Sequence, residues 1–217
     1  MITVPEAAKT IISRSRYLTE AISKGVVNNS SLARYIKPEI EDLVKKDVSM
    51  SSIIAAINRV SSTIKPKYVR SNIFEFPPEM ILRSSLTILN IVNSESLQEK
   101  HSALLKLSSQ RHFLGLTKGS FETTIVISGE LAKKVKETLR NEKVILEINK
   151  VSAITIQLPR KATETPGIFY FFLKSLAWEG INILEVISTQ SELTLVVNTK
   201  DVNRTYSILN ALFSGVI

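Results

Sequence analysis

The sequence predicts an α+β protein in which an all-helical N-terminal domain precedes two α+β units. Apolar residues recur at helical spacing through the first 64 residues, without an alternating run. From residue 81 onward, alternating runs such as LTILNIV and ETTIVIS are separated by helical stretches. Between these regions, KPKYVRSNIFEFPPE has three prolines and no sustained period, which is typical of a linker. We therefore expect a helical domain over 1–65, a linker over 66–80, a first unit over 81–150 and a second unit over 151–217.

Four helices are expected before the linker. The first ends at Gly25, since glycine tolerates the left-handed conformation that follows a helix. Pro38 disfavours helical geometry at the residue before it, so we expect two short helices, over 32–36 and 38–47. The last helix is capped by Ser49 and presents one apolar stripe, which consists of Ile53, Ile54, Ile57, Val60 and Ile64.

The region after the linker has the element order βαββα twice. With a final strand, this order gives an antiparallel sheet with both helices on one face, the ferredoxin-like arrangement. Residues 214–217 after the last helix are too few for a full strand, so the second repeat either borrows a strand or uses Val216 and Ile217 as a short edge. The predicted strands cover 85–92, 112–117, 121–128, 143–149, 151–158, 181–187 and 192–198, and the predicted helices cover 95–108, 130–141, 166–179 and 201–213.

The composition excludes several kinds of chemistry. The chain has no cysteine, which rules out disulfides, thiolate zinc sites and thiol nucleophiles. His101 and His112 lack the spacing of metal ligands, and residues 118–120 lack the upstream glycines of a phosphate loop. We expect no catalytic site, no metal and no cofactor, so the protein is predicted not to be an enzyme.

Charge and hydropathy indicate location and partners. No run of about 18 uncharged apolar residues occurs, and the N-terminus lacks the apolar stretch of a signal peptide. We expect a soluble cytoplasmic protein without membrane contact. The net charge of +8 is uneven, since residues 1–70 hold 12 Lys/Arg against 6 Asp/Glu and the remainder holds 16 against 14. The helical segment is therefore the part that would attract an anionic partner such as nucleic acid.

The second α+β unit contains a well-marked turn from strand to helix. Thr165 followed by Pro166 predicts an N-cap with proline at the first helical position. Gly167 would let a ligand approach the helix start closely. Gly180 suits the left-handed residue after the end of the same helix.

Three short motifs in this unit occur together: Pro-Gly at 166–167, Gly-Ile-Asn-Ile at 180–183 and Ser-Thr at 188–189. In this combination, residues 165–213 resemble the ACT domains of aspartokinases. The resemblance implies a regulatory module that commonly binds amino acids and forms dimers. No kinase domain accompanies it, so phosphoryl transfer is not expected.

The resemblance also implies where an amino acid would bind, between the Pro-Gly turn of one unit and the Gly-Ile-Asn-Ile strand of a partner unit in a homodimer. Backbone N–H groups at a helix start, together with the helix dipole, receive a carboxylate. An alternative stays open, in which these residues only begin and end helices and the units only dimerise. The first repeat has Asn93 and Ser94 at its turn and no Pro-Gly pair, which makes it the weaker site. The candidate ligand-binding residues are Thr165, Pro166, Gly167, Ile168, Asn182 and Ile183.

Residues 30–62 resemble the helix-turn-helix modules found ahead of ACT domains in prokaryotic, especially archaeal, regulators. Arg and Lys on such a module attract phosphates, and short polar side chains at a helix start reach base edges. The alternative is an ordinary solvated helix face, because Glu39, Glu41 and Asp42 oppose a continuous basic surface. The candidate DNA-contacting residues are Arg34, Lys37, Ser49, Ser51, Ser52, Asn58 and Arg59.

Two functions are compatible with the sequence. In the first, an amino acid bound by dimeric ACT-like units alters DNA binding by the helical domain and so controls transcription. In the second, the chain is a regulatory or scaffolding subunit of an amino-acid metabolic enzyme, and its helices contact protein instead of DNA.

Overall fold

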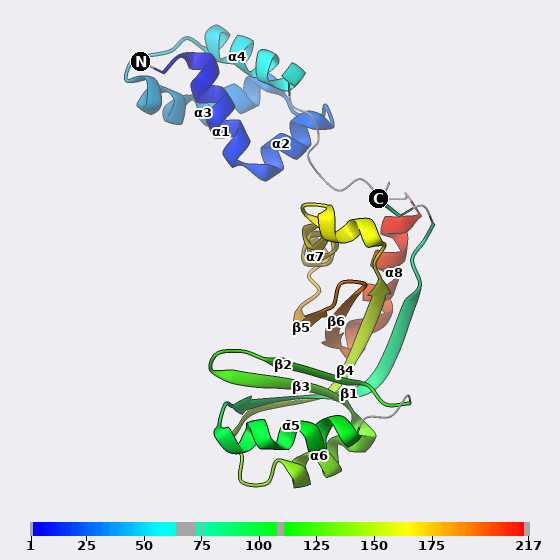
Figure 1. Cartoon of the computed structure of the whole chain (residues 1–217). Helices are drawn as coiled ribbons and strands as arrows, with labels where there is room; N and C mark the ends of the chain where they lie inside the picture. The colour runs from blue at the N-terminus through cyan, green and yellow to red at the C-terminus, as the bar shows by residue number, and fades with distance from the viewer. Residues whose placement is uncertain (1, 64–72, 75, 108–110, 215–217) are drawn as a thin grey trace. The chain divides into compact units, whose positions relative to one another are not determined.

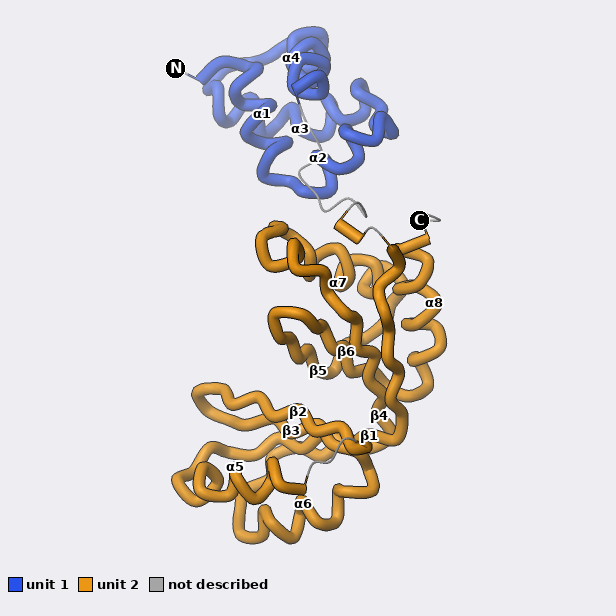
Figure 2. Tube along the Cα trace, turned by 45° about the vertical axis from the view of Figure 1, so that its right-hand side comes forward, with its two compact units in different colours: residues 1–67 blue, residues 68–217 orange. Residues whose placement is uncertain are grey.

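The computed structural model describes residues 2–63, 73–74, 76–107 and 111–214. The chain divides into two compact units, residues 1–67 and 68–217 (Figure 2). We refer to them as the helical unit and the sheet unit.

The helical unit consists of α1 (Val4–Arg14), α2 (Arg16–Ser23), α3 (Asn29–Val44) and α4 (Met50–Thr63). The prediction of one helix up to Gly25 was wrong, because the helix is interrupted at Ser15. The backbone of Ser15 is extended, and its hydroxyl accepts a hydrogen bond from the Leu18 N–H at 3.5 Å, so a single serine ends α1 and caps α2. Gly25 does adopt the expected left-handed conformation after α2, with φ at +70°.

The two short helices predicted on either side of Pro38 are one helix, α3. Proline inside a helix removes one hydrogen bond and costs about 3 kcal/mol. Here an uninterrupted apolar stripe crosses the proline and packs against α1 and α4. Burial of this stripe keeps the backbone helical, and its members are Leu32, Ala33, Ile36, Ile40 and Val44.

The predicted start of the last helix is confirmed. Ser49 Oγ accepts a hydrogen bond from the Ser52 N–H at 3.3 Å, and α4 begins at the next residue, Met50. The side chains of Ile53, Ile57 and Val60 are buried, as the apolar stripe indicated. Ile64, the last member of the predicted stripe, lies outside the described residues.

The sheet unit is a six-stranded antiparallel sheet with the strand order β2-β3-β1-β4-β6-β5. Helices α5 and α6 cover the outer face of one half of the sheet, and α7 and α8 cover the other half (Figure 1). The strands are β1 (Met80–Val92), β2 (Leu114–Lys118), β3 (Glu122–Ser128), β4 (Val144–Gln157), β5 (Ile183–Ser188) and β6 (Glu192–Asn198), and the helices are α5 (Glu95–Leu107), α6 (Ala132–Thr138), α7 (Ile168–Trp178) and α8 (Val202–Phe213).

Strands β1 and β4 are longer than predicted. The strands expected over 143–149 and 151–158 are one strand, and β1 begins at Met80 instead of residue 85. Each strand contains one non-glycine residue in the left-handed region, Ser85 at φ +56° and Lys150 at φ +58°. The register between the strands shifts beside both residues, so each strand passes from one half of the sheet into the other.

The second repeat therefore borrows its fourth strand. Residues 80–83 of β1 pair with residues 153–156 of β4, on the side of β4 opposite β6. Residues 86–92 of the same strand pair with β3 in the first repeat. Both strands thus belong to both repeats, which decides the alternative that the sequence left open. Val216 and Ile217 lie outside the described residues.

The sheet curls, so that β2 and β5, the strands at the two ends of the strand order, meet on its inner face. A Cβ atom at Gly115 of β2 would lie 2.5 Å from Ile187 Cδ1 of β5, so a larger residue here would require the Ile187 side chain to shift. The buried inner layer combines residues of both repeats, including Ile88 and Val126 from the first and Ala153 and Val196 from the second. The two repeats consequently share a core as well as strands.

The segment that enters the sheet unit is anchored by an aromatic contact. We call residues 73, 74 and 76–79 the connecting arm. The ring of Phe74 packs edge-on against Phe213, with centroids 4.9 Å apart, and against Phe172 at 6.1 Å. This contact holds the arm on the α7/α8 core just before the shared strand β1 begins.

We expect Phe74→Ala to lower the free energy of unfolding of the sheet unit by about 2 to 3 kcal/mol, because it removes a half-buried aromatic side chain next to a shared strand. Urea unfolding followed by circular dichroism measures the change. Phe121→Ala is the matched control, since Phe121 is 87% exposed and its removal should change stability by less than about 0.5 kcal/mol. Equal stability of the two variants would contradict the anchoring role.

Candidate functional site

The Pro-Gly turn lies between a short 3₁₀ turn, Arg160–Glu164, and helix α7. Thr165 is not the N-cap that the sequence predicted. Its hydroxyl donates to the Lys161 carbonyl at 2.7 Å, and Gly167 is the N-cap with φ at +88°. Because Gly167 is left-handed, Pro166 stays ahead of the helix and the first helical residue is Ile168.

The other predicted ligand residues have different degrees of exposure. Ile168 is buried in the core of the second repeat, so it positions the turn and offers little surface to a ligand. Asn182 is exposed in the loop before β5, and Ile183 is half-buried. Gly180 ends α7 at φ +69°, as predicted, and the next N–H bonds back to the Leu176 carbonyl at 2.9 Å.

One sheet unit does not bring the predicted ligand residues together. The Pro-Gly turn precedes α7 and Asn182 follows it, and a helix of 11 residues is about 16 Å long. A ligand held by both would need the turn of one copy and the strand of another.

A shallow apolar hollow of about 480 Å³ lies beside Ile183, and its other lining residues include Leu173, Ala177, Ile181 and Glu185. Burial, aided by the negative charge of Glu122, raises the pKa of Glu185.

The turn of the first repeat already holds a carboxylate. Glu142 accepts hydrogen bonds from Ser94 Oγ at 2.6 Å, from Ser96 Oγ at 2.7 Å and from Lys100 Nζ at 2.5 Å. Ser94 Oγ in turn accepts the Leu97 N–H at 3.0 Å at the start of α5. The Glu142 side chain is only 3% exposed. These hydrogen bonds, that from Lys100 first, lower its pKa to about 2.

The two repeats therefore differ at equivalent turns. The start of α5 is filled by an internal carboxylate held by two serines and a lysine. Among the described residues, no side chain caps the start of α7. The second turn leaves backbone N–H groups available to a carboxylate from outside, whereas the first turn is occupied by the protein itself.

The ionised Glu142 should make the sheet unit sensitive to acid. Its pKa is lower in the folded state than its ordinary value of 4.5, so its contribution to stability is complete above about pH 5 and is lost as the pH falls toward 2. Urea unfolding at pH 6 and pH 3 should show a smaller loss of stability in Glu142→Gln than in the wild type. Glu95→Gln, at an exposed position of α5, should lose as much stability as the wild type. If Glu142→Gln loses as much stability between pH 6 and pH 3 as the wild type does, Glu142 is not the source of the acid sensitivity.

The predicted DNA-contacting residues lie on α3, on α4 and at the turn between them. Arg59 is exposed on α4. Asn58 Oδ1 accepts a hydrogen bond from Asn29 Nδ2 at 2.7 Å, which ties α4 to the start of α3. Ser49, Ser51 and Ser52 cluster at the start of α4 through hydroxyl contacts of 3.1 and 2.8 Å. The structure thus places three of the polar candidates, Ser49, Ser51 and Ser52, together at the exposed start of α4, whereas Asn58 and Arg59 lie further along the helix.

The described helices carry a smaller net positive charge than residues 1–70 as a whole. Residues 2–63 hold nine Lys/Arg against six Asp/Glu, since Lys65, Lys67 and Arg70 lie outside the described residues. Lys37 pairs with Glu41 at 3.4 Å, and Arg34 donates to Ser31 Oγ at 3.1 Å. These contacts use part of the hydrogen-bonding capacity of Lys37 and Arg34, the two residues of α3 that are candidates for binding phosphate.

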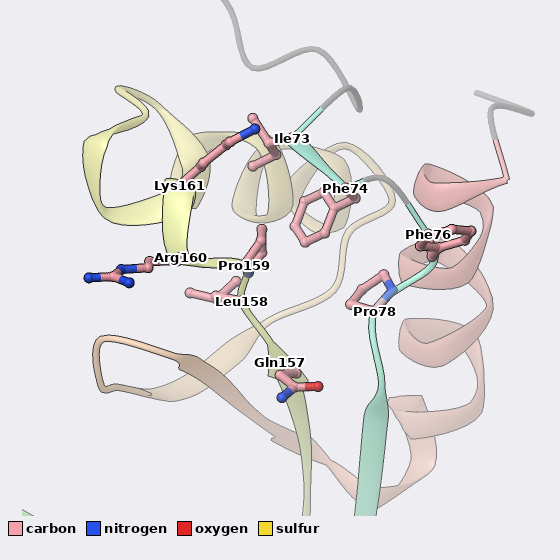
Figure 3. Close-up of a pocket in the computed structure, with 9 residues that line it drawn as sticks. All are labelled: Ile73, Phe74, Phe76, Pro78, Gln157, Leu158, Pro159, Arg160 and Lys161. Atoms are coloured by element: carbon pink, nitrogen blue, oxygen red, sulfur yellow. The ribbon is translucent and has the colours of Figure 1, made fainter.

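A second pocket, of about 530 Å³, was not recognised from the sequence (Figure 3). It lies between the connecting arm and residues 157–161 that follow β4. Phe74, Pro78 and Leu158 form apolar walls, and Lys161 extends toward Ile73 at the rim (Figure 3). No local pattern predicts this pocket, because the arm has no periodicity and its position beside residues 157–161 depends on long-range strand pairing.

No group of three potential metal ligands occurs within the described ranges of the chain. None of the helices described is long and apolar enough to cross a membrane.

Over 62–64% of the chain, the fold is similar to those of solved aspartate kinase structures. No protein-family model and no curated protein matches the chain. Among solved structures, the regulatory subunit of aspartate kinase from Thermus thermophilus aligns with a TM-score of 0.52 at 10% identity, over 62% of this chain and 97% of that one. The aspartokinase alpha and beta subunits align with a TM-score of 0.52 at 12% identity, over 64% and 99%. The aspartate kinase of Clostridium acetobutylicum aligns at 0.53 and 14%, over 64% of this chain but only 35% of the enzyme.

Proposed function

We propose that the protein is a non-catalytic, amino-acid-responsive regulator, in which the sheet unit binds the amino acid and dimerises and the helical unit binds DNA to control transcription. The observation that carries the ligand part is the difference between the two turns. Glu142 fills the first turn, whereas the start of α7 has backbone N–H groups and no side-chain cap among the described residues. A free amino acid would supply the missing carboxylate there.

Dimerisation completes this proposed site. The Pro-Gly turn and Asn182 are separated by the length of α7 within one chain. In a homodimer, the carboxylate of the ligand would bind at Gly167 of one copy, and its amino group would reach Asn182 of the other. Ligand binding then favours one dimer geometry over another, and the DNA affinity of two linked helical units changes with that geometry.

We expect at least one of the twenty amino acids to raise the thermal stability of the full chain. A ligand at 100 times its dissociation constant adds about 2.7 kcal/mol to the stability of the form that binds it. Gly167→Val and Asn182→Ala should each abolish the stabilisation, and differential scanning fluorimetry measures it. Asn203→Ala, at an exposed position of α8, is the control that should retain the stabilisation by the ligand. If none of the twenty stabilises the wild type, the proposed ligand response is wrong.

For the helical unit, we expect DNA binding that weakens steeply with salt. Arg59→Ala should lower the affinity by about tenfold and reduce the slope of log K against log salt by about one, because it removes one phosphate or base contact. Fluorescence anisotropy with labelled duplex DNA between 50 and 200 mM salt measures both. Lys9→Ala, an exposed position on α1, is the matched control and should bind like the wild type. Absence of binding at 50 mM salt would contradict this part.

The second candidate function is a regulatory or scaffolding subunit that does not bind DNA. The ion pair between Lys37 and Glu41, and the exposed Glu39 and Asp42 beside it, favour a mixed-charge protein contact over a phosphate surface. Failure to bind DNA, together with recovery of a stable complex with an enzyme of amino-acid metabolism, would distinguish this function from the first.

A further inference from the structure

All residues that line the pocket beside the connecting arm belong to one chain, whereas the proposed turn site needs residues from two copies. Its walls come from two segments that are far apart in the sequence, the arm and residues 157–161. Its volume of about 530 Å³ lies within the range of sites for small ligands. The Gln157 N–H donates to the Glu79 carbonyl at 2.9 Å, which fixes the two segments side by side.

The chemistry of the lining is mostly apolar with positive charge at the rim. Six lining residues are apolar, and neither Asp nor Glu is among the nine. The rim carries Lys161, which is exposed and has no ion pair with a carboxylate in the described part of the chain. Figure 3 shows the Lys161 ammonium directed toward the arm, whereas the guanidinium of Arg160 points away from it. The apolar lining residues are Ile73, Phe74, Phe76, Pro78, Leu158 and Pro159.

Phe76 is the most exposed of the apolar residues that line the pocket. Its side chain is 79% exposed although it stands at the edge of an apolar pocket. Phe74, two residues earlier, is held by Phe172 and Phe213, so the arm is anchored while Phe76 remains uncovered. Covering an aromatic ring with an apolar group is favourable in proportion to the area removed from water.

We propose that this pocket binds a small monocarboxylate with an apolar side chain, such as an apolar amino acid or the corresponding 2-oxo acid. The carboxylate pairs with Lys161, and the side chain packs between Phe76, Phe74 and Leu158. The site is additional to the turn site, and it needs no partner copy. The ligand would contact the connecting arm, which leads directly into β1.

The test is isothermal titration calorimetry on the full chain, with L-leucine, L-phenylalanine and their 2-oxo acids as probes and L-lysine and L-aspartate as controls. We expect saturable binding of the apolar probes only. Phe76→Ala and Lys161→Gln should each weaken it by roughly tenfold or more, since one removes an apolar contact and the other a charge-assisted hydrogen bond. A preference for the amino acids over the 2-oxo acids identifies the ligand as an amino acid, and the reverse identifies an oxo acid.

Phe121→Ala is the matched control, an 87% exposed phenylalanine outside the pocket, and it should bind like the wild type. Gly167→Val and Asn182→Ala should also retain binding, which separates this pocket from the turn site. Amide hydrogen exchange should slow in a peptide over residues 76–83 when the probe is present and stay unchanged over 117–122. Binding that survives Phe76→Ala and Lys161→Gln but is lost in Gly167→Val would overturn the pocket and leave the proposed turn site standing. Absence of binding by all four apolar probes would also overturn it.

Discussion

The sheet unit depends on the antiparallel pairing of β1 with β4. Each strand is a member of both repeats, because Ser85 and Lys150 turn the strands from one half of the sheet into the other. A left-handed conformation at a non-glycine residue costs about 1–2 kcal/mol. The ladder on both sides of each bend offsets this cost, since every strand hydrogen bond lost would leave a polar backbone group without a partner. The second repeat has no complete sheet without residues 80–83 of β1, whereas the strand segments of the first repeat all come from residues 81–150.

The two repeats have one topology but differ in chemistry at their equivalent helix starts. The equivalent helix starts face the same requirement, which is to satisfy N–H groups that have no partner within the helix. At α5 the Ser94 hydroxyl accepts the Leu97 N–H, and the Glu142 carboxylate in turn accepts hydrogen bonds from Ser94, Ser96 and Lys100. At α7 a left-handed Gly167 begins the helix without such a group. The first repeat thus has a turn that holds an internal carboxylate, whereas within the described residues no side chain caps the helix start of the second.

The connecting arm joins the shared strand pair to the pocket beside Lys161. It leads directly into the strand segment that the second repeat borrows, and Phe74 fastens it to the α7/α8 core. The same segment forms one wall of the pocket beside Lys161. A ligand that contacts the arm therefore acts on the segment through which the helical unit is attached. Coupling of this kind requires only that the ligand bind one conformation of the arm more tightly than another.

Local sequence signals by themselves determined the element order of the sheet unit, the start of α4 at Ser49 and the left-handed ends at Gly25 and Gly180, because each depends on residues within one turn or one strand. They were wrong at Ser15 and Pro38, where a hydroxyl cap and burial of a continuous stripe outweigh simple propensity. Only the tertiary structure decided the borrowed strand, the Glu142 carboxylate at the first turn and the pocket between the arm and residues 157–161. Each of these joins segments about 50 to 80 residues apart, and no local periodicity carries information about which distant segments pair.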